Sequence, residues 1–174
     1  MKRNTVLFTI CILIFICAKL WLRQAGNDEL LFLLTPTNWG VELFTNSATS
    51  YSSQSGYYYP EIDILIEKSC SGFNFLLISF LMITYVLSKV ESLKTALVTP
   101  VALLLAYVTT IVANVSRIVT YIVMIKQQLP ARLDPADVWL HKAEGTLVYL
   151  SFLLITYFSL NQIITKLTRH EKSA

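Results

Sequence analysis

The sequence predicts an all-α polytopic membrane protein with about four transmembrane helices and a small extracytoplasmic loop or β-hairpin segment. Composition is the first reason. Of the 174 residues, 55% are hydrophobic and only 14% are charged, and the mean hydropathy is +0.57, more than a soluble core of this size needs. The second reason is that the apolar residues gather in runs close to the ~20 residues with which a helix crosses a bilayer. We therefore expect a single membrane domain over residues 1–174.

Four apolar runs define the expected spans. They cover about residues 5–22, 70–88, 96–125 and 145–164. The first run follows Lys2 and Arg3 as in a signal peptide, but it is long and no convincing cleavage site follows it, so we expect an uncleaved anchor. Lys19, near the far end of this run, could extend its amine to the interface.

Basic residues predict the orientation of the spans. With the amino terminus inside, seven of the fourteen Lys and Arg residues fall in three short inner segments, as the positive-inside rule requires. They are Lys2, Arg3, Lys89, Lys94, Lys166, Arg169 and Lys172. We therefore expect both termini in the cytoplasm, a location in the cell (cytoplasmic) membrane, and two outer segments at residues 23–69 and 126–144.

The first outer segment contains weaker signals of structure. Its apolar run Leu30–Leu34 is too short to span a bilayer and suggests an interfacial helix. The Ser-, Thr- and Asn-rich stretch 45–56 predicts a loop tip. Isoleucines alternate with other residues over 62–67, which is strand periodicity and predicts a small β-hairpin leading to Cys70. The tyrosines at 57–59 fit this hairpin or an interfacial aromatic belt equally well.

Three polar residues from three helices are expected at one depth in the membrane. A helix rises about 1.5 Å per residue, and the hydrocarbon core is about 30 Å thick. Counted from the inner ends of their spans, Cys70 and Arg117 reach the outer boundary, and His141 lies about one turn above it. We therefore expect these three residues at about one level.

This set could carry out acyl transfer. Cys70 is expected at a helix N-terminus, where free N–H groups and the macrodipole favour a thiolate, and Arg117 lies in an apolar run, where charges are usually functional. Cys70 would be the nucleophile and His141 the base and then the acid. Arg117 would stabilise an oxyanion or bind a substrate carbonyl or carboxylate. The candidates for supporting roles are Asn114, Glu144 and Asp137.

Three short motifs resemble those of the exosortase/archaeosortase family of polytopic membrane cysteine transpeptidases. They are Ser69-Cys70-Ser71-Gly72 at the opening of a span, Asn114-x-x-Arg117-Ile118 late in the next span, and His141-x-x-x-Gly145 at the opening of the last. The likeness covers roughly Glu61 to Ile164. The short chain is most similar to compact members such as the exosortase K type, because the extra spans and the appended domain of many relatives are missing.

The resemblance implies a reaction at the outer face of the membrane. Enzymes of this family are thought to recognise a carboxy-terminal sorting signal of an exported protein, made of a short motif, a transmembrane helix and a basic tail. They cleave it through a thioacyl-enzyme and pass the acyl group to an acceptor. By this resemblance Cys70 is the nucleophile, Arg117 and His141 complete the site, and the partners are the exported substrate and the lipid bilayer. Hydrolysis without transfer stays open.

Other functions also stay open. In a non-enzymatic membrane scaffold or assembly partner, Cys70 would only pack, while Arg117 and His141 would bind lipid phosphates. Thiol–disulfide exchange needs a resolving cysteine at the outer face, whereas Cys11 and Cys17 lie in the first span. A channel has little support because few polar residues face inward. No basic patch favours nucleic acid, and no CxxC or Cys/His pair with zinc spacing occurs, so we expect no metal or other cofactor.

Overall fold

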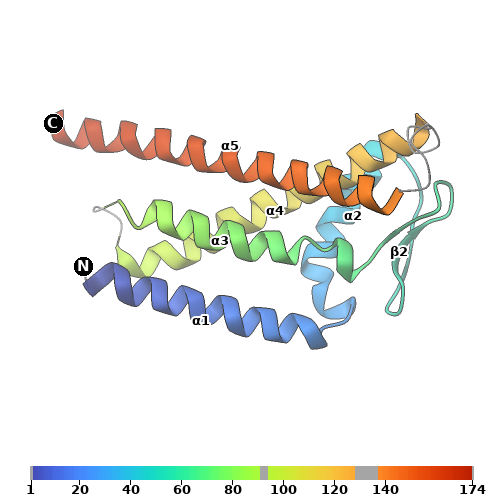
Figure 1. Cartoon of the computed structure of the whole chain (residues 1–174), viewed down its shortest axis with the longest axis horizontal. Helices are drawn as coiled ribbons and strands as arrows, with labels where there is room; N and C mark the ends of the chain where they lie inside the picture. Colours follow the sequence, from blue (N-terminus) through green and yellow to red (C-terminus); the bar gives the residue numbers. More distant parts are fainter. Residues whose placement is uncertain (1, 91–93, 128–136, 174) are drawn as a thin grey trace. The chain divides into compact units, whose positions relative to one another are not determined.

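The computed structural model describes residues 2–90, 94–127 and 137–173. In these ranges the chain forms five α-helices, two short 3-10 helices and one small sheet (Figure 1). The α-helices are α1 Lys2–Gln24, α2 Leu31–Thr45, α3 Phe73–Leu87, α4 Thr95–Lys126 and α5 Asp137–Ser173. The 3-10 helices are η1 Asp28–Leu30 and η2 Lys68–Cys70.

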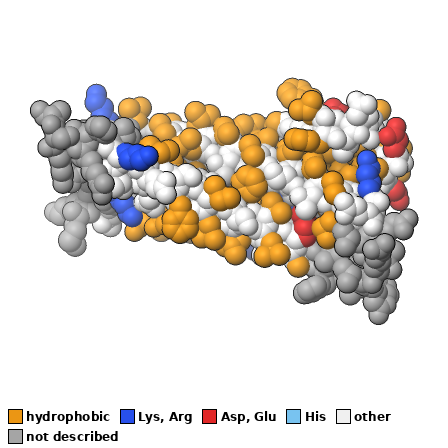
Figure 2. Space-filling view, turned by 90° about the horizontal axis from the view of Figure 1, so that it is seen from above, with side chains coloured by type: hydrophobic (Ala, Val, Ile, Leu, Met, Phe, Trp, Pro, Cys, Tyr) orange, Lys and Arg blue, Asp and Glu red, His pale blue; other side chains and the backbone are white. Residues whose placement is uncertain are grey.

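Four helical stretches are long and apolar enough to cross a membrane. They are Thr5–Gln24, Lys68–Leu87, Thr95–Lys126 and Ala143–Lys166. Large apolar side chains along these stretches are exposed, among them Leu13 on α1, Leu104 on α4 and Ile155 on α5. Figure 2 shows many hydrophobic side chains on one face of the molecule. The predicted fold class, an all-α membrane protein with four spans and a small sheet, is confirmed.

The chain packs as two compact units. The first unit comprises Met1–Gln24, Asn74–Thr110 and Phe152–Ala174, and the second comprises Ala25–Phe73 and Ile111–Ser151. The division cuts through α4 and α5, so each of these long helices contributes one part to each unit. Cys70, Arg117 and the other predicted site residues all belong to the second unit.

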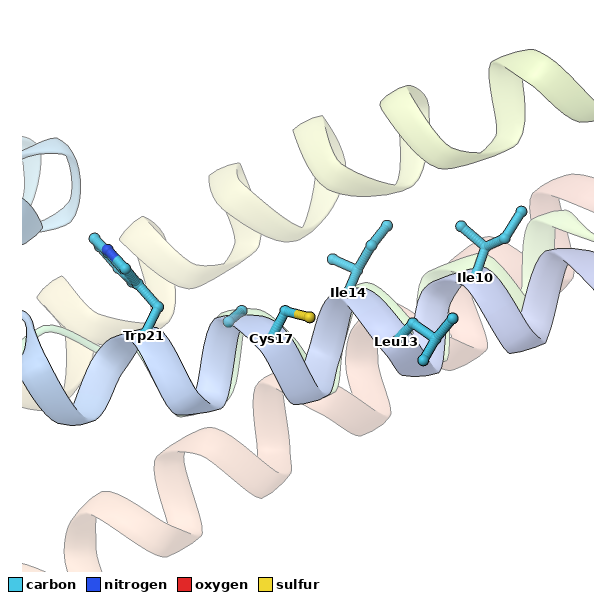
Figure 3. Close-up of a pocket in the computed structure, with 6 residues that line it drawn as sticks. Ile10, Leu13, Ile14, Cys17 and Trp21 are labelled. Atoms are coloured by element: carbon cyan, nitrogen blue, oxygen red, sulfur yellow. The ribbon is translucent and has the colours of Figure 1, made fainter.

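In the first unit, α1 packs one stripe and exposes another. The ring of Phe8 lies 6.2 Å from that of Tyr85 on α3, and Cys11 is fully buried. Lys19 donates to the Asn74 side chain of α3. The opposite side of α1 carries an open apolar hollow (Figure 3), lined at helical spacing by Ile10, Leu13, Ile14, Cys17, Ala18 and Trp21. A hollow of this composition suits lipid acyl chains.

In the second unit, α2 is longer than the apolar run Leu30–Leu34 suggested. It continues through Pro36 although proline removes one helical hydrogen bond. The reason is its buried stripe, whose spacing matches one face of a helix and consists of Leu33, Leu34, Thr37, Asn38 and Val41. The helix ends at Thr45. Asn46 follows in the left-handed conformation (φ 51°), and its N–H donates to the Glu42 carbonyl at 2.8 Å.

A three-stranded antiparallel sheet follows α2. Its strands, in the order β1-β2-β3, are β1 Ser50–Ser52, β2 Gly56–Tyr59 and β3 Ile64–Ile66. The predicted hairpin before Cys70 is confirmed. The loop predicted over 45–56 is present at residues 46–49 and in the turn 53–55, but the strand β1 interrupts it. The turn between β1 and β2 closes at Gly56, whose φ of +86° suits a short hairpin loop.

The tyrosines of β2 attach the sheet to α2. Tyr57 and Thr35 hydrogen-bond through their hydroxyls at 2.9 Å, and the fully buried Tyr59 donates to Asn38 Oδ1 at 2.7 Å. Burial raises the pKa of the Tyr59 hydroxyl, and the nearby Glu42 carboxylate adds to this shift. Tyr59 is therefore a core residue rather than part of an aromatic belt at the membrane surface.

Candidate active site

Cys70 lies in a tight turn ahead of α3. The Cys70 N–H donates to the Glu67 carbonyl at 2.8 Å, and the Ser71 N–H donates to the Lys68 carbonyl at 3.2 Å. Gly72 then adopts φ 71°, in the left-handed region, and α3 begins at Phe73. The sequence placed Cys70 inside the helix, at the start of a span over 70–88. The glycine conformation interrupts the helix there, so Cys70 belongs to η2.

The N-terminus of α3 is capped by a serine. The Ser71 hydroxyl accepts a hydrogen bond from the Phe73 N–H at 3.4 Å, which occupies one of the N–H groups that the sequence argument assigned to a Cys70 thiolate. Positive charge near the thiol comes instead from Arg117, which interacts electrostatically with Cys70. The charged group on this side of Cys70 is therefore a guanidinium on α4.

The buried Asn27 holds this turn against the rest of the second unit. Its Oδ1 accepts from the Lys68 N–H at 2.8 Å, and its Nδ2 donates to the carbonyls of Ser53 at 3.1 Å and Gln54 at 3.3 Å. The Lys68 amine also donates to the Ala25 carbonyl at 2.5 Å. The segment before α2, the β1–β2 turn and the Cys70 turn are thereby joined at one side chain.

The Cys70 thiol is half-buried and has a polar neighbour in its own turn. Ser69 Oγ lies 3.7 Å from Cys70 Sγ and 3.0 Å from Glu67 Oε1. Since an ionised carboxylate can only accept, the serine hydroxyl donates to Glu67, and its oxygen is left to accept from the thiol. Cys70 is thus partly exposed, beside a polar hydroxyl of its own turn.

Asn114 holds the backbone of Cys70. It is fully buried on α4, and its Nδ2 donates to the Cys70 carbonyl at 2.7 Å and to Thr37 Oγ1 at 3.3 Å. Its Oδ1 accepts from the Tyr149 hydroxyl at 2.7 Å. Asn114 therefore connects α2, η2 and α5 through its side chain.

Arg117 lies one turn beyond Asn114 on the same face of α4. Its Nη1 donates to the Tyr149 hydroxyl at 3.1 Å, and its guanidinium carbon is 5.4 Å from the centre of the Tyr149 ring, within cation–π range. Glu144, which is 8% exposed, also interacts with it electrostatically. This attraction partly offsets the cost of burying the guanidinium charge.

Gly145 makes room for the arginine. A Cβ atom at position 145 would lie 3.3 Å from Arg117 Cδ, which is a tight contact, and 2.6 Å from Arg117 Nε, which is closer than real contacts allow. The His141-x-x-x-Gly145 spacing therefore has a physical explanation at its second residue. A glycine there lets the guanidinium lie against the backbone of α5.

The structure brings together four of the six residues predicted from the sequence. They are Cys70, Asn114, Arg117 and Glu144. The other two, Asp137 and His141, are part of helix α5, but their side chains lie outside the described part of the chain. Their roles stay predictions. In the described ranges, no three His, Cys, Asp or Glu side chains are grouped to bind a metal.

Sequence reasoning missed Thr37 and Tyr149. Thr37 follows a proline in a segment that did not read as helix. Tyr149 lies in an apolar run and is one of nine tyrosines. The sequence feature that could have identified Tyr149 is its spacing, because it follows Gly145 by four residues and therefore occupies the same face of α5.

Comparison with known proteins identifies the family of this chain. Residues 4–158 match the family model of the transmembrane exosortases, the EpsH exosortases. Among curated proteins and solved structures, none matches the chain. The matched range includes Cys70, Arg117 and His141; a place in the K type stays a prediction. Since the match covers most of the sequence, the chain belongs to the transmembrane exosortase family.

Proposed function

We propose that this protein is a membrane-embedded cysteine peptidase or transpeptidase. It cleaves carboxy-terminal sorting signals of exported proteins at the outer face of the cytoplasmic membrane through a thioacyl-enzyme. Membership of the exosortase family supports the substrate class. The observation that carries the chemistry is the partly exposed Cys70, whose carbonyl is joined to Arg117 through the hydrogen bonds of Asn114 and Tyr149.

Each step of the reaction has a candidate group. The Cys70 sulfur attacks the scissile carbonyl, and the thiol proton passes to His141, which returns it to the leaving amine as the C–N bond breaks. Arg117 stabilises the oxyanion, because a guanidinium carries five N–H donors and a fixed positive charge. An acceptor amine, or water, then releases the acyl group from the thioester.

His141 is the part of this proposal that rests on helix geometry alone. Positions 141, 145 and 149 follow one another at four-residue intervals along α5, so they share one face of that helix. Gly145 and Tyr149 on this face both contact Arg117. Asp137, one further turn toward the helix start, is a candidate to orient the histidine.

The proposed orientation places both termini in the cytoplasm and the Cys70 turn outside. The basic residues beside the inner ends of the spans support it. A membrane-impermeant maleimide added to intact cells should then label Cys70 in a Cys11→Ala/Cys17→Ala background. Labelling of Cys70 only after the cells are permeabilised would reverse the orientation.

The proposed reaction is tested by looking for the acyl-enzyme and its products. We would compare cells that carry the natural chain, Cys70→Ala, or Cys17→Ala as a matched control at an exposed cysteine. Mass spectrometry should find an adduct on the Cys70 peptide that hydroxylamine removes, and exported proteins that have lost an apolar carboxy-terminal helix. Both should disappear in Cys70→Ala alone.

The scaffold alternative makes the opposite prediction. In that case Cys70→Ala and the natural chain would give the same carboxy termini on every exported protein, and the Cys70 peptide would carry no hydroxylamine-sensitive group. That combination of results would overturn the peptidase proposal.

A further inference from the structure

The hydrogen bonds between Arg117 and Cys70 can run in one direction only. A guanidinium can only donate, and a backbone carbonyl can only accept. Arg117 Nη1 therefore donates to the Tyr149 oxygen, and Asn114 must present Nδ2 to the Cys70 carbonyl. Its Oδ1 then faces Tyr149, which supplies its proton there. The guanidinium at one end, which can only donate, and the carbonyl at the other end, which can only accept, therefore require the same direction for every hydrogen bond between them.

Tyr149 is the member of this chain that joins its two halves. Its oxygen accepts from Arg117 at 3.1 Å, and its proton goes to Asn114 at 2.7 Å. The ring also packs under the guanidinium, 5.4 Å from its carbon atom. A phenylalanine would keep this ring contact and remove both hydrogen bonds, leaving the buried Asn114 oxygen without that donor.

We propose that Tyr149 is a positioning residue that holds the guanidinium of Arg117 beside the Cys70 thiol and orients Asn114 against the Cys70 backbone. This inference deepens the proposed function, because it concerns the same site. Its physical content is nevertheless separate from peptide cleavage. If Tyr149 has this role, the positive electrostatic potential of Arg117 at the Cys70 thiol depends on the Tyr149 hydroxyl.

The charge at the thiol can be measured with two alkylating reagents. Iodoacetate is an anion and iodoacetamide is neutral, and both react with the thiolate. The ratio of their rate constants therefore cancels the thiolate fraction and reports the local potential. We would measure this ratio for Cys70 in detergent-solubilised full-length protein carrying Cys11→Ala and Cys17→Ala. Arg117→Ala gives the value without the guanidinium.

Tyr149→Phe should lower the iodoacetate to iodoacetamide ratio by about threefold to tenfold, the size of effect that one displaced charge has near a protein surface. The ratio should approach that of Arg117→Ala although the charge is still present. In the Arg117→Ala background, Tyr149→Phe should have no further effect on the ratio. Tyr157→Phe, on the same helix in the other unit, is the matched control and should leave the ratio unchanged.

An unchanged ratio in folded Tyr149→Phe protein would overturn the inference, as would an equal decrease with and without Arg117. Thermal melting of each variant in detergent establishes that it is folded. Failure of this inference is distinguishable from failure of the proposed function. If sorting signals are cleaved but the ratio ignores Tyr149, only the positioning role is wrong. If the ratio falls but nothing is cleaved, the positioning role stands and the peptidase proposal fails.

Discussion

Two tyrosine–asparagine pairs in the second unit have the same local geometry and different surroundings. Tyr59 donates to Asn38 Oδ1 and Tyr149 donates to Asn114 Oδ1, each at 2.7 Å. The amide of Asn38 then donates to Glu42 Oε1 at 3.0 Å, one turn along its own helix. The amide of Asn114 instead reaches the Cys70 carbonyl from another element.

The difference indicates what each pair does. The hydrogen bonds of the Tyr59–Asn38 pair lead to the Glu42 carboxylate, whose Oε1 also accepts from the Thr49 hydroxyl at 2.5 Å. This pair attaches the sheet to α2. The Tyr149 pair ends in a guanidinium and in the backbone of a partly exposed cysteine. The same donor and acceptor therefore serve stability in one place and the arrangement of charge in the other.

The largest effect should come from closing the space beside Arg117. In Gly145→Ala the new methyl group would lie 2.6 Å from Arg117 Nε, so the guanidinium must move. We expect cleavage of sorting signals to fall at least tenfold, the size expected when a positioned charge is displaced. The measurement is the rate of sorting-signal cleavage in membranes, with the alkylation ratio at Cys70 beside it.

Gly40→Ala is the matched control for this substitution. Its Cβ would lie 2.5 Å from Val115 Cγ2, an equally close approach to an apolar side chain. We expect a loss of stability of about 1–3 kcal/mol from overpacking without a change in the alkylation ratio. Equal ratios in the Gly145 and Gly40 variants would mean that the close approach at Gly145 is only a packing feature.

A comparison of the two asparagines should give an intermediate effect. Asn114→Ala removes the donor to the Cys70 carbonyl, and Asn38→Ala removes the side-chain acceptor of Tyr59, which keeps only the longer contact to the Asn38 carbonyl at 3.3 Å. Each leaves a polar group without its partner, so each should lower the free energy of unfolding by about 1–3 kcal/mol. Only Asn114→Ala should also change the rate of Cys70 alkylation. If Asn38→Ala changed that rate equally, the two pairs would not be separate in function.

The smallest effect should be a pH dependence of stability at Tyr59. Because burial raises the pKa of this hydroxyl in the folded protein, its contribution to stability is present below the unfolded pKa of about 10 and is lost as the pH rises through the folded value. Melting temperatures measured in detergent above about pH 10 should therefore fall more steeply in the natural chain than in Tyr59→Phe. Parallel curves would show that Tyr59 ionises as freely in the folded protein as in the unfolded chain.

The parts of the site that could be predicted were those with a local signal. Arg117 is a charge inside an apolar run, and Cys70 precedes another such run, so counting residues along two helices placed them at one level. Tyr149 could not be found in this way, because a tyrosine in an apolar run fits packing against lipid or protein equally well. Its role depends on Asn114 and Arg117, more than thirty residues away.

For the fold too, only features with a local signal could be predicted. The sequence by itself determined four spans, because apolar composition over about 20 residues decides whether a helix suits a bilayer. It also determined that a hairpin leads to Cys70. Only the tertiary structure decided that α2 continues through Pro36, that Gly72 ends the Cys70 turn before α3, and that Gly145 admits the guanidinium. These depend on contacts between segments distant in sequence, whose free energy outweighs local preference.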